Sequence, residues 1–178
     1  MTLNLLRFPA KRLRANYLVQ KAYRKGHTGV LCFSCGNSSA ALRNAVLAAE
    51  LPLIVLDISP HGDLTANRWF TQLEIARIWP DFLDGTSGHV TDTELSVISN
   101  LFRHYLGELG PGPWYVPTGS GETILALALA YPHTSFVPVY SLDEWTQYNE
   151  EAPRNEQVRQ VNEPIYDPTG ISWIEKNC

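Results

Sequence analysis

Hydrophobic and polar positions follow one another in blocks that predict alternating helices and strands. Residues 29–33 and 53–56 are apolar throughout, which is typical of short strands buried on both faces. Two further β-prone runs stand at 114–116 and 135–140. Because segments with helical periodicity separate these runs, the pattern predicts an α/β fold with an open, mostly parallel sheet and helices on both faces.

Helical periodicity and helix-end signals mark the segments between the strands. The predicted helices cover 10–25, 38–50, 66–79, 91–107, 124–130 and 141–148. Ser38 or Ser39 is expected to cap the second, and Glu94 follows Thr91 by three residues, which is the spacing of a capping box. Between the helices, residues 84–89 predict a polar loop and 163–170 a turn region rich in proline.

Charge and hydropathy narrow the class of protein. The chain of 178 residues carries a net charge of -4, which predicts no general affinity for nucleic acid. No apolar run has the length of a membrane span, and the first residues lack the pattern of a signal peptide. We therefore expect a cytoplasmic protein without a membrane partner.

The cysteines do not predict a metal site. Cys32 and Cys35 have the spacing of a redox or zinc motif, but no second Cys/His pair accompanies them. We expect Cys32 to be buried in a strand and the chain to bind no metal.

A glycine-rich stretch at 116–127 carries the first candidate chemistry. It reads as the end of a buried strand, a turn with Gly119 and Gly121, and the start of an apolar helix. Backbone N–H groups and the helix dipole would converge there, which favours a phosphate. The alternative is an ordinary strand-to-helix turn capped by Thr or Ser. The stretch lacks the lysine of a nucleotide P-loop and the third glycine of a dinucleotide fingerprint.

A second strand-to-helix turn, at 34–39, is rich in serine and contains Asn37. Ligands of open α/β sheets bind at the carboxyl ends of strands, where both turns are predicted to lie. The two turns could therefore face one polar ligand. The alternative is a pair of capped helices without a ligand.

Four motifs follow one another in a characteristic order: Lys11 at a helix start, Gly36-Asn37 after the next strand, the loop at 118–123, and the segment 163–170. In this order the chain resembles the fold-type II pyridoxal-phosphate enzymes, above all the D-cysteine desulfhydrase and aminocyclopropane-carboxylate deaminase group. Cysteine synthase and tryptophan synthase β are similar at greater distance. The resemblance implies one compact unit over residues 1–178, with a smaller lobe at about 34–110, and a homodimer.

The resemblance also implies site residues. Lys11 would carry the cofactor as a Schiff base and move the α-proton, and Tyr166 is a candidate acid or base. Residues implied to bind pyridoxal phosphate are Lys11, Asn37, Thr118, Gly119, Ser120, Gly121, Thr123 and Thr169. Residues implied to bind the substrate carboxylate are Ser34, Ser38 and Ser39.

This chain departs from the family pattern in three ways. It is far shorter, Glu122 replaces a glycine of the phosphate loop, and Asp167-Pro168 stands as an insertion between Tyr166 and Thr169. A carboxylate near a phosphate dianion lowers phosphate affinity unless it points away. These departures favour a relative that has lost catalytic activity.

Pyridoxal phosphate stabilises a carbanion next to an amino acid's nitrogen. The function expected from the resemblance is therefore elimination, deamination or replacement at the β or γ carbon of an amino acid. The alternative is a non-catalytic relative that serves as a binding or assembly protein. A shortened, open site could also admit an amino acid carried on a larger molecule, such as a modified nucleic-acid base, with the basic residues among the first 25 as the contact. The simpler interpretation of those basic residues is a solvated helix face.

Overall fold

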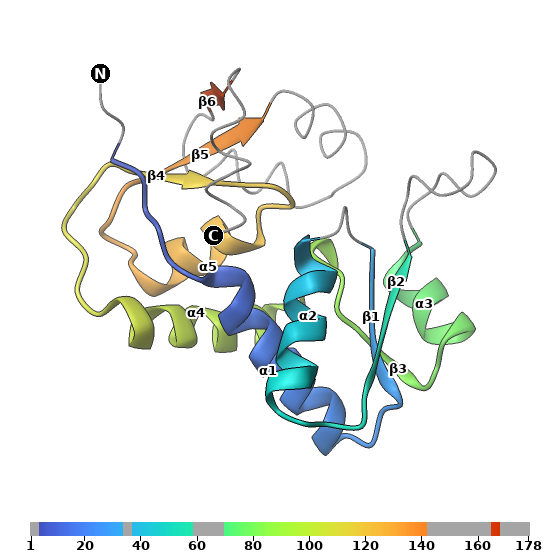
Figure 1. Cartoon of the computed structure of the whole chain (residues 1–178). Coiled ribbons are helices and arrows are strands. Elements are labelled where there is room, and N and C mark those ends of the chain that lie inside the picture. Colours follow the sequence, from blue (N-terminus) through green and yellow to red (C-terminus); the bar gives the residue numbers. More distant parts are fainter. Residues whose placement is uncertain (1–3, 34–36, 59–69, 142–164, 168–178) are drawn as a thin grey trace. The chain divides into compact units, whose positions relative to one another are not determined.

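The computed structural model describes residues 4–33, 37–58, 70–141 and 165–167 (Figure 1). Tertiary contacts divide the chain into two compact units. Unit 1 consists of Met1–Ala10 together with Thr91–Cys178, and unit 2 consists of Lys11–Val90. Each unit holds its own parallel sheet and its own helices, so each is described by itself.

Unit 2 is built on a three-stranded sheet with the order β2-β1-β3, and both pairings are parallel. Its elements are α1 (Ala10–Arg24), β1 (Gly29–Phe33), α2 (Asn37–Ala48), β2 (Ile54–Ile58), α3 (Gln72–Ile78), β3 (Phe82–Asp84) and the 3-10 turn η1 (Ser87–His89). The predicted parallel pairing of the first two strands across a helix is confirmed.

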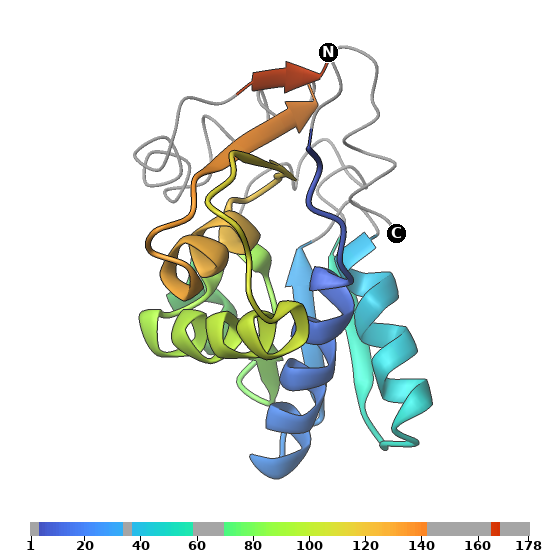
Figure 2. The ribbon, with the colours of Figure 1, turned by 90° about the vertical axis from the view of Figure 1, so that its left-hand side faces the viewer.

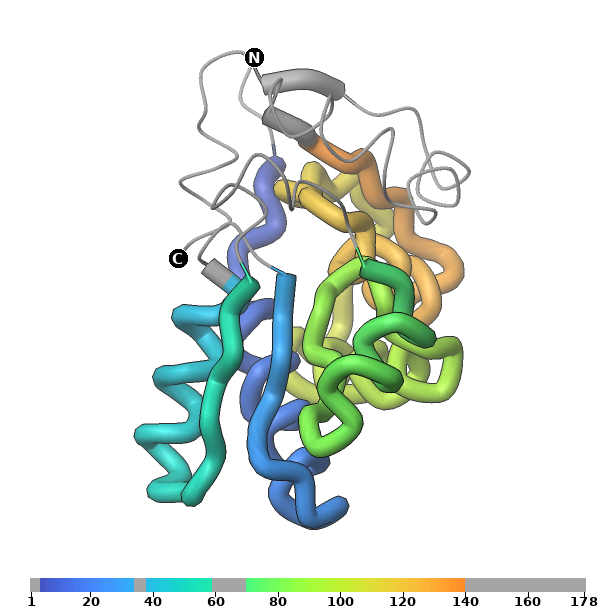
Figure 3. The backbone as a smooth tube through the Cα atoms, turned by 90° about the vertical axis from the view of Figure 1, so that its right-hand side faces the viewer, coloured from blue at the N-terminus to red at the C-terminus, as the bar shows by residue number. Residues whose placement is uncertain are grey.

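The central strand β1 packs against helices on both faces. Successive side chains of a strand point to opposite faces, so Val30 and Cys32 join one core and Leu31 and Phe33 join another. The first core is completed by α1 and α2, and the second includes Ile75 of α3. Helices therefore cover both faces of this sheet, as the apolar run predicted (Figure 3).

The carboxyl ends of the strands and the N-terminal ends of two helices lie at one edge of this sheet, where ligands of α/β proteins bind. The N-terminal ends of α1 and α2 lie at the edge formed by the carboxyl ends of β1 and β2 (Figures 1 and 3). The carboxyl end of β3 lies at the same edge because β3 runs parallel to β1. We call this the unit 2 edge.

Two expectations for unit 2 were wrong in their bounds. The helix expected from residue 66 begins at Gln72, because Thr71 is its N-cap and forms a capping box with Glu74. Residues 59–69 lie outside the described part. The loop expected at 84–89 begins at residue 85 in the structure, because Asp84 is the last residue of β3. A strand of only three residues leaves too little periodicity to recognise.

The start of α2 also differs from expectation. The helix already includes Asn37, so Ser38 and Ser39 lie in its first turn and neither is its cap. The helix expected at 124–130 also begins earlier, at Glu122. Two helix ends agree with glycine signals in the sequence. Gly26 takes a positive φ of 73° just after α1, and Gly107 is the C-cap of α4 (Asp92–Leu106).

Unit 1 holds a second three-stranded parallel sheet, with the order β4-β5-β6. Its strands are β4 (Trp114–Pro117), β5 (Phe136–Ser141) and β6 (Ile165–Asp167), and α5 (Glu122–Ala130) connects the first two. Helix α5 packs against the sheet, and α4 packs alongside α5 (Figures 1 and 2). The core includes Ile98 and Phe102 of α4, Leu127 of α5 and Phe136 of β5, all at most 1% exposed.

The chain forms two separate small sheets among its described residues, where the sequence predicted one. The lead-in explains part of this difference. Leu5 forms a parallel bridge with Tyr115 of β4, and the Leu6 N–H donates to the Tyr115 carbonyl at 2.9 Å. With β5 along one side of β4 and the lead-in along the other, no side of β4 is open to a strand of another sheet.

Two further expectations concern the end of the chain. Residues 163–170 were expected to form a turn region, but Ile165–Asp167 forms β6, paired with β5. A three-residue strand between prolines carries no clear sequence signal, and only the tertiary pairing identifies it. The helix expected at 141–148 falls on residues outside the described part, apart from Ser141, which ends β5.

Candidate functional site

The sequence-predicted site residues are distributed over both units. In unit 1, the glycine loop connects the carboxyl end of β4 to α5. Thr118 opens this loop and is 2% exposed. Its N–H donates to the Val139 carbonyl at 2.9 Å, and its hydroxyl donates to the Val116 carbonyl at 2.7 Å. The backbone N–H and the hydroxyl of Thr118 thus both donate to carbonyls of the strands, which fixes the loop onto the sheet.

The N-terminus of α5 differs from two other helix starts in the chain. Gly121 is its N-cap, in a left-handed conformation with φ 93° and ψ -4°, and it makes no side-chain capping bond. Helices α3 and α4 instead begin with capping boxes, made by Thr71–Glu74 and Thr91–Glu94. The Thr or Ser cap considered as the ordinary alternative is therefore absent at α5. A helix start without a side-chain cap leaves its first N–H groups for another acceptor, such as an anion.

Glu122 is the first residue of α5 and is 4% exposed. A carboxylate in the first turn interacts favourably with the helix dipole. The same charge opposes a phosphate at that helix start, and burial weakens the screening by water. Glu122 is therefore the residue of this loop that works against anion binding.

In unit 2, Lys11 lies in the first turn of α1 and is half-buried. Asn37 is the first residue of α2. The two helix starts lie at the unit 2 edge, so the structure brings the backbone positions of Lys11 and Asn37 to one edge of one sheet (Figure 1). Ser34, Cys35 and Gly36 lie outside the described residues.

The first turn of α2 is tied to β2. The fully buried Ser39 donates its hydroxyl to Asp57 Oδ2 at 2.6 Å, and Arg43 Nη2 donates to Ser39 Oγ at 3.3 Å. Within the described residues, the buried Asp57 Oδ1 has no hydrogen-bond partner. In this structure Ser39 gives its only hydroxyl hydrogen to Asp57, and its contact with a substrate carboxylate stays a prediction.

Cys32 lies beneath this network in β1 and is fully buried, as predicted. Burial, together with the nearby Asp57 carboxylate, raises the pKa of its thiol to about 12 against the opposing charges of Arg14 and Arg43. A thiol with such a pKa stays protonated near neutral pH, so Cys32 is a packing residue rather than a nucleophile.

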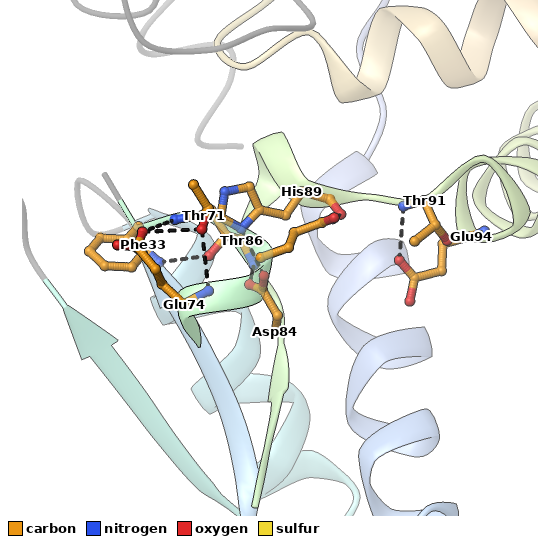
Figure 4. Close-up of polar contacts among 9 residues, drawn as sticks. Phe33, Thr71, Glu74, Asp84, Thr86, His89, Thr91 and Glu94 are labelled. Atoms are coloured by element: carbon orange, nitrogen blue, oxygen red, sulfur yellow. Dashed lines mark hydrogen bonds and ion pairs between the residues drawn. The ribbon is translucent and has the colours of Figure 1, made fainter. Parts of the chain in front are cut away.

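A third group of polar contacts at the unit 2 edge surrounds β3 (Figure 4). His89 Nδ1 lies 2.7 Å from Asp84 Oδ2, and the Thr86 N–H donates to Asp84 Oδ1 at 3.0 Å. The Thr86 hydroxyl accepts from the N–H of Phe33, the last residue of β1, at 3.2 Å. The sequence analysis missed this pair, although a carboxylate and a histidine five residues apart in a polar segment are a usable signal.

The η1 turn also contacts the start of α2. Ser38 Oγ and Ser87 Oγ are 3.5 Å apart, which joins the first turn of α2 to the segment that carries His89. The unit 2 edge thus gathers Lys11, Asn37, Ser38, Ser39, Asp84 and His89.

The remaining predicted residues are less informative. Thr123 lies in the first turn of α5, and Tyr166 pairs with Tyr140 through the backbone of β6 and β5. Thr169 lies outside the described residues. The described part of the chain holds no group of three or more His, Cys, Asp or Glu side chains that could bind a metal ion.

No helix in the described ranges is long and apolar enough to cross a membrane. A search for known protein families found none that matches this chain, and a search of curated proteins found no match either.

Proposed function

We propose that this chain is a pyridoxal-phosphate-dependent enzyme that acts on an amino acid by elimination, deamination or replacement at the β or γ carbon. The observation that carries the proposal is the unit 2 edge, where Lys11 lies in the first turn of α1 and α2 begins at Asn37. A primary amine and an amide at one edge of a parallel sheet are the groups that a carbonyl-bearing, ring-hydroxylated cofactor requires.

The glycine loop of unit 1 supports the same proposal, because it is suited to bind the phosphate group of the cofactor. The α5 start offers backbone N–H groups without a side-chain cap, as a phosphate requires. Gly119, Ser120, Gly121 and Thr123 are the proposed phosphate-binding residues, and Thr118 shapes the loop. Bound pyridoxal phosphate would supply an electron sink for the α carbon of the substrate.

The other proposed roles belong to the chain's own side chains. Lys11 holds the cofactor through its amine and moves the α-proton. Asn37 donates to the ring oxygen, and Ser34 and Ser38 orient the substrate carboxylate at the start of α2. Tyr166 is a proposed acid or base, and Thr169 is the proposed partner of the ring nitrogen.

The test is covalent labelling of the purified chain. After addition of pyridoxal phosphate and reduction with borohydride, we expect a visible absorbance band before reduction and a single labelled peptide that contains Lys11. Lys11→Ala should remove both signals. Lys25→Ala is the matched control, because Lys25 is an exposed lysine just after the same helix. A colourless mixture, or a label that persists in Lys11→Ala, would overturn the proposal.

A second candidate function is a non-catalytic relative that binds the cofactor or a similar anion and serves in assembly. The observation that favours it is the buried Glu122 at the start of α5. Bound cofactor without turnover of any amino acid in a broad panel would support this second function. Glu122→Gly, which restores the residue expected from the resemblance, should then tighten cofactor binding.

The proposal has two further parts, namely a substrate amino acid carried on a larger molecule and a homodimeric state of the chain. An amino acid carried on a modified nucleic-acid base requires contact with nucleic acid, so binding to DNA or RNA at low salt tests it. A homodimer is proposed from the resemblance alone, and light scattering tests it.

A further inference from the structure

We propose that His89, held by Asp84, is the general acid that protonates the leaving group of the amino-acid substrate. The pair lies at the unit 2 edge, and no part of the proposed function so far uses it. The substrate class rests on the proposed function, whereas the geometry of the pair does not.

Asp84 is held at both of its carboxylate oxygens. Oδ1 accepts from the Thr86 N–H at 3.0 Å, and Oδ2 lies 2.7 Å from His89 Nδ1. The first bond fixes the rotation of the carboxylate, and the second therefore fixes the plane of the imidazole. This is the arrangement by which a carboxylate orients a proton-transferring histidine.

The contact with Asp84 also sets the tautomer. An ionised carboxylate only accepts hydrogen bonds, so Nδ1 carries the hydrogen in the neutral ring and Nε2 carries the lone pair. This assignment follows from the hydrogen-bond partners. Nε2 is then the ring atom that takes a proton from water and delivers it to a ligand.

The ring is held by Asp84 and is partly exposed to solvent. The His89 side chain is 16% exposed and that of Asp84 is 20% exposed. Gln72 of α3 donates through Nε2 to the His89 carbonyl, which anchors the backbone of the residue. The charged group that contacts His89 among the described residues is Asp84.

The pair belongs to the candidate site because its segment contacts the residues on either side of 34–36. The Thr86 hydroxyl accepts from the N–H of Phe33, the residue before this segment, and Ser87 contacts Ser38 in the first turn of α2. A substrate whose carboxylate lies at the start of α2 would thus lie close to the segment that carries His89.

The proton transfer balances in a simple way. Lys11 takes the α-proton of the substrate, and the electron pair left at the α carbon forms a double bond to the β carbon. The bond between the β carbon and the leaving group then breaks, and its electron pair departs with the leaving group. Nε2 of the protonated ring supplies the proton that neutralises this group, and the ring returns to its neutral form. Asp84 stays ionised throughout and acts as a positioning residue.

The variants separate proton transfer from simple structural support. His89→Asn keeps a donor close to the position of Nδ1 and so keeps the Asp84 contact, but it has no group that titrates. His89→Gln loses that contact as well. His104→Gln, at an exposed histidine of α4, is the matched control. A purely structural role predicts that His89→Asn behaves like the unaltered chain.

The test compares two substrates on the chain loaded with pyridoxal phosphate. Chloride leaves β-chloroalanine as a stable anion, whereas the hydroxyl of serine must be protonated as it leaves. We expect His89→Asn to lower serine elimination about 100-fold or more and to keep β-chloroalanine elimination within about threefold. Nitrogen-15 NMR of the unloaded chain should show the Nδ1–H tautomer, lost in Asp84→Ala.

The outcomes separate this inference from the proposed function. If the unaltered chain eliminates both substrates and His89→Asn slows neither, or slows both equally, the His89 assignment is wrong and the proposed function stands. An Nε2–H tautomer in the NMR spectrum also overturns the assignment. If the unaltered chain eliminates neither substrate, the proposed elimination and the role of His89 fail together.

Discussion

The carboxyl edges of the two sheets present polar groups in opposite ways. At β4 in unit 1, the loop into α5 offers backbone N–H groups, and its helix begins at Gly121 without a side-chain cap. At the unit 2 edge, the polar groups are side chains that contact one another. Ser39 donates a hydrogen bond to Asp57, and His89 contacts Asp84. One edge is open through its backbone, whereas the other is ordered by hydrogen bonds between side chains.

The difference shows what each edge is suited to bind. Backbone donors converging on a helix start suit a rigid anion such as a phosphate. Side chains held in fixed orientations suit proton transfer and the recognition of a smaller polar group. The following predictions test this contrast, from the largest expected effect to the smallest.

Gly121→Val should have the largest effect. A φ of 93° is strained for a β-branched residue, so we expect a loss of roughly 1–3 kcal/mol in the free energy of unfolding. We also expect binding of pyridoxal phosphate to become undetectable, because the loop backbone must move. Urea denaturation and an absorbance titration measure the two effects. Gly107→Ala is the control: φ is 69° there and a Cβ meets open space, so stability falls while binding stays.

Asp57→Ala should have the next largest effect, on the free energy of unfolding. It removes the acceptor of a fully buried hydroxyl, and losing a hydrogen bond to a charged group costs about 1.5–3 kcal/mol. Asp57→Asn keeps an oxygen acceptor for Ser39 and should cost less than half as much. Equal losses in the two variants, compared by urea denaturation, would show that the charge of Asp57 matters more than its acceptor.

Alkaline pH should weaken the core beneath the unit 2 edge. The unfolded Cys32 thiol ionises above its ordinary pKa of 9.0, whereas burial raises the folded pKa to about 12. The unfolded state therefore binds fewer protons between these values, and stability falls as the pH rises, by about 1.4 kcal/mol per pH unit from this group. Denaturation at pH 8, 9 and 10 should show a shallower decline in Cys32→Ala. Parallel declines in the two proteins would contradict a buried thiol.

Thr91→Ala should have the smallest effect and none on binding. It removes the capping box of α4, at a cost of about 1 kcal/mol in the free energy of unfolding. Cofactor affinity should not change, because this helix start is already closed by its own side chains. Thr91→Ser keeps the cap and is the control. A change in affinity in Thr91→Ala would remove the distinction between capped and uncapped helix starts.

Local signals in the sequence determined most of the elements. The apolar run at 29–33 predicted a strand buried on both faces, and its side chains do join cores on both sides. The Thr91–Glu94 spacing predicted a capping box that the structure contains. Such features succeed because they depend on neighbours within a few residues, where propensity and capping energies act.

Tertiary contacts decided the rest. The strands β3 and β6 have three residues each, too few for a periodic pattern, and pairing with β1 and β5 defines them. The bridge that covers one side of β4 joins Leu5 to Tyr115, although 110 positions separate them in the sequence. The Asp84–His89 pair at the unit 2 edge likewise requires the turn after β3 to close. Sequence patterns report local preferences, whereas these contacts exist only once distant segments have packed together.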